Sequence, residues 1–463
     1  MTTPQRKEVS TFGLITALLF FLAAPVSEVD SATSAPLAIV GGTVLDLSGA
    51  GASQADIHDA VVLIEGERIV AVGERGTLGI PDGTRIIDAS GMYVLPGLID
   101  GFGAIDNQSY ADAYLYMGVT SVVTLSGMRR GPLYEQADPA PKMFKLMGIA
   151  PHPRSTEQIL GQIDEAAAQG YRIVLLMYGV TPEQLRLAVR RAHELGMTVI
   201  GELGSTSYAE AIETDIDAFV HTIRYSLDLV PPDLARAIAA DHHGMEDRQT
   251  LIDYQQFFID LEADDPRLSE HAALLATSGK PLIPTLALQY LPLPFSTNPW
   301  NEPIAGILDA ADIHMPANRA TGEHDVPAEA AARWERLATK LFMVDSAYCA
   351  AGAHYLAGSG TDLLGTMPGI SIHTELELLV RLGLSPRQAI AAATANFAEF
   401  LGWQDVGLLE RGRYADILVL ARNPLEDLRN LKRIEVLIEG GEVVDRDSLI
   451  DGHTLESRVD RAL

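Results

Sequence analysis

The sequence has very little cysteine: Cys349 is the single one in 463 residues. An internal disulfide is therefore excluded. Cysteine-rich zinc modules and iron–sulfur clusters are excluded as well, because each needs several thiolates. With no second thiol to act with, Cys349 is expected to be a small buried side chain.

Basic side chains are scarce too. Lys and Arg number 34 against 62 Asp and Glu, which gives a formal net charge of −28 at pH 7. Nucleic acids and anionic lipid surfaces both attract clustered basic side chains, so neither is an expected partner. A hydrophobic share of 47% with 21% charged residues is that of a folded globular chain. The expected partner is a small molecule, and the sequence also allows a homo-oligomer.

Long apolar runs are missing except near the N-terminus. There, Arg6 and Lys7 precede an apolar run over residues 12–24, and small residues follow at 29–31. This order is typical of a signal peptide, and the run is shorter than the ~20 residues of a membrane span. We therefore expect residues 1–35 to be a signal peptide and leader, and the protein to be exported, either periplasmic or secreted. The alternative is an uncleaved anchor.

Both ends of the remaining chain show the pattern of short strands. Strand-like runs lie at 37–46, 60–73, 85–88, 415–420 and 434–445. They alternate β-branched residues with turns, and Gly66 marks the centre of a hairpin. Two strand-rich ends around a different middle predict one small β domain built from both ends of the chain.

The middle of the chain alternates short apolar runs with amphipathic helices, which is the rhythm of a parallel α/β barrel. The strand-sized runs lie at 118–125, 171–177, 197–200, 218–221, 280–284 and 354–358. Thr181 and Pro182 predict the start of a helix that reaches Leu195, because a threonine cap followed by proline favours a helix start. Ser385 is the expected cap of one long last helix that runs to Leu401.

Four motifs together resemble a known family. They are Leu95-Pro-Gly-Leu-Ile-Asp100, Gly358-Ser-Gly-Thr-Asp362, His373-Thr-Glu-Leu-Glu-Leu-Leu-Val380 and the stretch from Gly407 to Leu420. On these residues the chain resembles the amidohydrolase superfamily, in the branch of imidazolonepropionases and metal-dependent dipeptidases. The resemblance implies a (β/α)8 barrel of the TIM type over 96–401. It also implies a β-sandwich assembled from 36–95 and 402–463, and a hydrolase of C–N or related bonds.

The metal centre that the resemblance implies is incomplete in this sequence. Its ligands are a His-x-His pair, a carboxylated lysine, two further histidines and an aspartate, which hold ions that lower the pKa of water from ~15.7 to about 7. Gly101 and Gly103, with Phe102 between them, stand in place of the His-x-His pair. Leu175 stands near the place of the lysine, and Glu202 stands in place of the first of the two further histidines. His221 and Asp362 remain. We therefore expect no two-metal centre and no cofactor, with a single zinc held by Glu202, His221 and Asp362 as the alternative.

Three ionisable side chains are candidates for catalysis, because the carboxyl ends of barrel strands form the usual catalytic rim. Asp362 suits a general base, and His221 suits a proton relay. Glu202 suits one half of an acid/base pair with Asp362. Structural roles are the alternatives: loop hydrogen bonds for Asp362, core packing for His221 and a solvated loop position for Glu202.

Four residues are candidates for contact with a substrate. Arg224 presents a guanidinium fork suited to a carboxylate, and Tyr225 follows it. Phe102 places an apolar ring between the two glycines that replace the implied histidine pair, which predicts an aromatic or aliphatic ligand at the position of the implied metal. His373 precedes a helix and either orients the last barrel loop toward a substrate or is structural.

Three functions stay open at this point. The sequence favours an enzyme that acts on a small molecule by acid/base chemistry, through hydrolysis, elimination or isomerisation. The second is a hydrolase with a single metal ion. The third is a pseudoenzyme that binds a ligand without turning it over. The fold alone does not choose between them, since one fold supports many chemistries.

Overall fold

The computed structural model describes residues 35–126, 133–221, 227–241, 247–289, 298–324 and 327–453. The apolar run of the predicted signal peptide lies outside the described residues, and so do Arg224 and Tyr225. Among the residues that are described, no helix is both long enough and apolar enough to cross a membrane.

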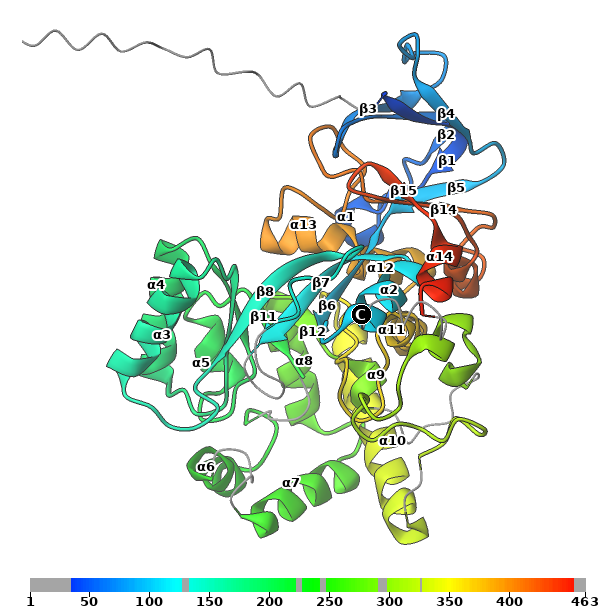
Figure 1. Cartoon of the computed structure of the whole chain (residues 1–463). Helices are drawn as coiled ribbons and strands as arrows, with labels where there is room; N and C mark the ends of the chain where they lie inside the picture. The colour runs from blue at the N-terminus through cyan, green and yellow to red at the C-terminus, as the bar shows by residue number, and fades with distance from the viewer. Residues whose placement is uncertain are drawn as a thin grey trace, which may run out of the picture. The chain divides into compact units, whose positions relative to one another are not determined.

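A mixed sheet gathers strands from both ends of the chain (Figure 1). Its strands are β1 Leu37–Val44, β2 Ile57–Glu65, β3 Arg68–Glu74, β4 Arg85–Asp88, β5 Tyr93–Pro96, β13 Ile417–Leu420, β14 Ile434–Glu439 and β15 Glu442–Val444. The order is β15-β14-β13-β5-β1-β2-β3, and β4 pairs with β1. Gly66 has a φ of 54° between β2 and β3, which confirms the predicted hairpin. The two chain ends join where β5 runs antiparallel to β13.

Seven parallel strands follow one another around a barrel in sequence order. They are β6 Leu98–Gly103, β7 Val119–Ser126, β8 Lys142–Ile149, β9 Ile173–Leu176, β10 Thr198–Gly201, β11 Ala218–Val220 and β12 Leu282–Ile283. The segment 354–358 closes the ring. On one side the Leu282 amide donates to the His354 carbonyl at 2.8 Å, and on the other the Gly101 amide donates to the Ala357 carbonyl at 2.8 Å. The predicted fold class, an α/β barrel with a β domain from both chain ends, is confirmed.

The helices connect and surround these strands (Figure 1). They are α1 Ser48–Gly51, α2 Gln108–Tyr116, α3 Thr156–Ala168, α4 Pro182–Glu194, α5 Tyr208–Ile212, α6 Pro232–Ala240, α7 Arg248–Asp260, α8 Pro266–Ser278, α9 Leu286–Gln289, α10 Ala328–Ala350, α11 Ile370–Leu382, α12 Pro386–Ala392, α13 Ala395–Leu401 and α14 Arg446–Asp451. The predicted start of α4 is confirmed. The Thr181 hydroxyl accepts from the Gln184 amide, and the Gln184 side chain accepts from the Thr181 amide.

The prediction of one long helix from Ser385 to Leu401 is wrong, because α12 and α13 are separate helices. The break has a cause in the barrel. The Ala392 carbonyl accepts from the Ala357 amide at 2.8 Å, and the Ala393 carbonyl accepts from the Ile99 amide at 2.7 Å. A continuous α-helix would use both carbonyls for its own amides four residues later. The barrel strands take them instead.

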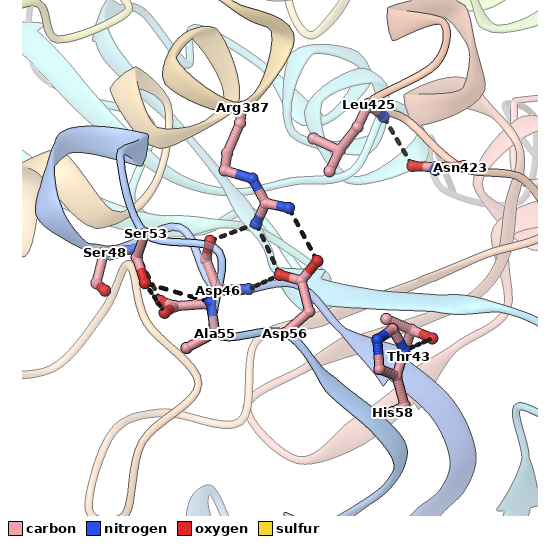
Figure 2. A network of polar contacts seen from close by, with 10 residues as sticks. All are labelled: Thr43, Asp46, Ser48, Ser53, Ala55, Asp56, His58, Arg387, Asn423 and Leu425. Carbon is pink, nitrogen blue, oxygen red and sulfur yellow. Dashed lines mark hydrogen bonds and ion pairs between the residues drawn. The ribbon is translucent and has the colours of Figure 1, made fainter.

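Arg387 ties helix α12 to the first part of the sheet domain (Figure 2). Its two terminal nitrogens donate to the two carboxylate oxygens of Asp56 at 2.7 and 2.8 Å. One of them also donates to the Asp46 carbonyl at 2.6 Å. Burial works to raise the pKa of Asp56, but the hydrogen bonds from Arg387 hold it below its ordinary value. This two-pronged ion pair fixes α12 against the segment between β1 and β2.

Candidate active site

The three predicted catalytic side chains lie at one end of the barrel. Glu202 directly follows β10, His221 directly follows β11, and Asp362 follows the closing segment 354–358. All three sit beyond the carboxyl ends of their strands, and parallel strands place these ends together. The side chains are buried, with residue exposures of 6% for Glu202, 4% for His221 and 5% for Asp362. The alternative of a solvated Glu202 is therefore wrong.

Asp362 is held by a tyrosine from the helix that follows β6, the strand next to the closing segment 354–358. Tyr110 lies in α2, and its hydroxyl donates to Asp362 Oδ2 at 3.0 Å. The same hydroxyl lies 3.1 Å from the Asp312 carbonyl. The ring of Tyr110 is fully buried. The sequence reading missed Tyr110, since no motif links it to a residue 252 positions away.

The sequence reading also missed a buried network that positions the chain just before Asp362. Asp100 accepts from the Ser359 amide at 2.8 Å and from the Ser359 hydroxyl at 2.5 Å. The Ser359 hydroxyl lies 2.6 Å from the Thr361 hydroxyl. Burial raises the pKa of Asp100 to about 6, although these hydrogen bonds oppose the rise. The sequence did contain a signal for this network, because Asp100 ends one of the quoted motifs and Ser359 lies inside another.

His221 contacts an aromatic ring and a hydroxyl. The Phe102 ring meets it edge-on, with the ring centroids 5.1 Å apart. Its Nδ1 atom lies 2.5 Å from Oγ1 of Thr285, the second residue after β12. Thr285 went unassigned in the sequence, although the apolar run 280–284 already placed it at the carboxyl end of a barrel strand.

Apolar side chains fill the barrel interior. Phe102 and Leu175 belong to one cluster of buried apolar residues there. Other members of the cluster are Ile99, Val123, Leu146, Met177, Ile200, Val220, Ile283 and Phe397. Leu175, at the place of the implied lysine, and Phe102, between the two glycines that replace the implied histidine pair, therefore both pack against hydrocarbon. Phe102 also reaches His221, so it belongs to the same end of the barrel as the candidate catalytic residues.

His373 lies apart from this group, and it lies inside α11, so the prediction that it precedes a helix is wrong. Its Nε2 atom donates to the Met117 carbonyl at 2.9 Å, and the ring is buried. Burial lowers the pKa of His373 to about 3, so the ring is neutral. Met117 stands just before the amino end of β7, at the end of the strand away from Glu202, His221 and Asp362. This geometry fits the structural alternative for His373 and gives no contact with the candidate active site.

Glu375, in the same motif, supports the loop that follows β12. Its Oε2 atom accepts from the Ala287 amide at 2.8 Å. Among the described residues, its Oε1 atom has no hydrogen-bond partner. Burial raises the pKa of Glu375 to about 8, so the carboxyl group keeps its proton at neutral pH. Glu375 thus has the supporting or structural role that its place in the motif suggests.

Replacing Glu375 by glutamine is expected to change how stability depends on pH. The pKa of this group is 4.5 ordinarily and about 8 in the folded protein. Its contribution to stability is therefore complete below pH 4.5 and is lost as the pH rises toward 8. Glu375→Gln has no proton to lose, so its melting temperature relative to wild type is expected to be higher at pH 8 than at pH 4.5.

Thermal unfolding of both proteins across this range makes the measurement. Glu377→Gln, at a partly exposed position on the same helix, is the matched control. A difference between Glu375→Gln and wild type that stays constant with pH would show that Glu375 is already ionised in the folded protein.

Comparisons with known proteins agree with this architecture. The model of the amidohydrolase family matches residues 302–444. The imidazolonepropionase of Deinococcus radiodurans is 27% identical over 403 residues, which cover 80% of this chain and 88% of that protein. The imidazolonepropionase of Deinococcus deserti is 25% identical over 401 residues, with the same coverage of the two chains.

Solved structures show the same fold. A putative prolidase from Bifidobacterium longum superposes with a TM-score of 0.60 at 21% identity, over 91% of this chain and 99% of the other. A bottromycin amidohydrolase superposes with a TM-score of 0.62 at 18% identity, over 90% of each chain. At these identities the structures show the fold alone.

These comparisons support membership of the amidohydrolase superfamily. Membership supports a hydrolase that acts on C–N bonds, and members of the superfamily usually use metal ions.

Proposed function

We propose that the chain hydrolyses a C–N bond in a small molecule by acid/base chemistry of its own side chains, and that it does so outside the cytoplasm, as its N-terminal segment predicts. One observation carries the proposal. Glu202, His221 and Asp362 are buried beyond the carboxyl ends of the barrel strands. Gly101, Gly103 and Leu175, which have no group that binds a metal ion, stand where metal ligands are implied.

The side chains present do not fit the two-metal centre of the superfamily. A bound metal ion would supply hydroxide from water at neutral pH. Nδ1 of His221 is engaged with Thr285, and Oδ2 of Asp362 is engaged with Tyr110. Over the described ranges, no three His, Cys, Asp or Glu side chains are grouped so that they can hold a metal ion. The proposed reaction therefore uses only the side chains of the protein.

In the proposed reaction, Asp362 or His221 takes a proton from water while the water oxygen bonds to the carbon of the C–N bond. The bond to nitrogen then breaks, and the leaving nitrogen receives a proton. Glu202 is the third ionisable group at this end of the barrel and suits the role of proton donor. The Phe102 ring forms an apolar wall, which favours a substrate with an aromatic or aliphatic group beside the scissile bond.

The names of the relatives suggest the first substrates to test. Two are imidazolonepropionases, and one structural neighbour is a putative prolidase. A panel of imidazolones, Xaa-Pro dipeptides and N-acyl amides with aromatic groups covers these C–N bonds. Binding of a panel compound without turnover would favour the ligand-binding pseudoenzyme instead.

Removal of metal ions is expected to leave the activity unchanged. The purified protein is dialysed against a chelator, its metal content is measured by elemental analysis, and turnover is compared before and after. We expect metal well below one ion per chain and the same rate in both samples. If chelation abolishes turnover and zinc restores it, the single-zinc alternative with Glu202, His221 and Asp362 is correct and the metal-free proposal fails.

A further inference from the structure

Thr285 has one hydroxyl proton and two close polar neighbours. Its Oγ1 atom lies 2.7 Å from the Pro284 carbonyl oxygen and 2.5 Å from Nδ1 of His221. The residue is completely buried. A carbonyl oxygen can only accept a hydrogen bond, whereas an imidazole nitrogen donates or accepts according to its tautomer.

Only one arrangement of protons satisfies both contacts. If the hydroxyl donates to Pro284, it accepts from a proton on Nδ1 of His221. If the hydroxyl donates to Nδ1 instead, its oxygen lone pair faces the carbonyl oxygen at 2.7 Å, which is unfavourable because the two negative partial charges repel each other. The first arrangement is therefore favoured. The hydrogen bond that one ring nitrogen makes then decides which nitrogen of neutral histidine carries the proton.

The backbone is strained at both residues of this contact. Thr285 has a φ of 50° and His221 a φ of 57°, both in the left-handed region. A β-branched residue such as threonine is a genuine outlier there, and such a conformation persists only where the surrounding structure holds it. A strained residue thus follows each of the neighbouring strands β11 and β12, and the side chains of these two residues are hydrogen-bonded to each other.

A second contact holds the loop that carries Thr285. The chain turns directly into α9 after Thr285, and Glu375 accepts from the Ala287 amide at 2.8 Å. On the other side of His221, the Phe102 ring meets the imidazole edge-on. The imidazole is therefore fixed both by a hydroxyl on a held loop and by an aromatic ring.

We propose that Thr285 is a positioning residue that fixes His221 as the tautomer with its proton on Nδ1. Nε2 then carries the lone pair and is the nitrogen that accepts a proton at the catalytic end of the barrel. The tautomer follows from the hydrogen bonds alone. Its catalytic meaning rests on the proposed function, in which His221 moves protons.

The tautomer is read directly by NMR on the full-length protein labelled with ¹⁵N-histidine. Long-range ¹H–¹⁵N correlations at alkaline pH distinguish the two tautomers of neutral imidazole, and the His221→Gln spectrum identifies the His221 signals by their loss. Wild type is expected to show the pattern of a proton on Nδ1. Thr285→Val, which keeps the shape and removes the hydroxyl, is expected to shift His221 toward a proton on Nε2. Thr285→Ser is expected to keep the wild-type pattern.

Two spectral results overturn the proposal: a proton on Nε2 in wild type, or an unchanged pattern in Thr285→Val that still melts cooperatively.

Kinetics separate this outcome from the proposed function. If the panel yields a substrate, Thr285→Val is expected to lower kcat by about ten- to a hundredfold with little change in KM, less than the ~10²–10⁴-fold loss of a whole base. The matched control Thr277→Val, at an exposed site in α8, is expected to keep the wild-type rate. The Nδ1 pattern without turnover of any panel compound would leave the tautomer standing and refute the proposed function.

Discussion

Asp362→Asn is expected to lower kcat/KM by about 10²–10⁴-fold on the substrate that the panel identifies, which is the usual contribution of a positioned acid or base. The amide has almost the same shape as the carboxylate, and its oxygen still accepts from the Tyr110 hydroxyl, which lies 3.0 Å from Asp362 in wild type. It cannot take a proton. The loss is therefore expected in the rate, with a melting temperature close to that of wild type.

Two further variants sharpen this measurement. Asp309→Asn makes the same chemical change at an exposed position and is expected to have no effect on the rate. Tyr110→Phe keeps the carboxylate but removes its hydrogen bond, and an intermediate loss of rate is expected. If Asp362→Asn retains full activity, Asp362 only fixes its loop, which is the structural alternative.

Phe102→Ala is expected to lower the free energy of unfolding by about 3–5 kcal/mol, the usual cost of deleting a buried phenylalanine ring. Phe102 belongs to the apolar cluster inside the barrel, so the lost ring leaves a cavity that a closed ring of strands cannot easily collapse. It also leaves the His221 imidazole without its edge-on contact. Chemical denaturation of both proteins measures the difference.

Phe102→Leu is the matched control, because it retains most of the apolar volume. It is expected to cost less than about 1.5 kcal/mol. A loss in Phe102→Ala no larger than in Phe102→Leu would mean that the ring does not fill the barrel interior. If a small aromatic compound restores the stability of Phe102→Ala, the vacated space lies open to ligands, as expected for the end of the barrel where catalysis takes place.

The fold was predictable because its signals are local or repeated. Apolar runs of strand length recur between amphipathic helices, and the cap formed by Thr181, Pro182 and Gln184 determines the start of α4 within a few residues. The closing segment 354–358 was also visible as an apolar run. The break between α12 and α13 was not, because its cause is a pair of hydrogen bonds from Ile99 and Ala357, far away in the chain.

The candidate site was predictable only in part, for the same physical reason. Asp362 and His221 stand in patterns that locate the ends of barrel strands, so their shared end of the barrel followed from the topology. The partners of these two side chains lie on other elements: Tyr110 lies in α2, and Thr285 follows β12. Which hydroxyl meets which side chain depends on the stagger of strands and helices, which periodicity does not specify.

The pairing of β5 with β13 sets the order in which the newly made chain can complete its sheet. β13 begins at Ile417, so the edge of β5 that pairs with it stays open until the chain has been synthesised beyond this residue, more than 300 residues after β5. An open strand edge attracts other strand edges, and contacts between distant parts of a chain form slowly. Any chain cut short before Ile417 keeps β5 unpaired on this side, which makes truncated forms prone to associate through that edge.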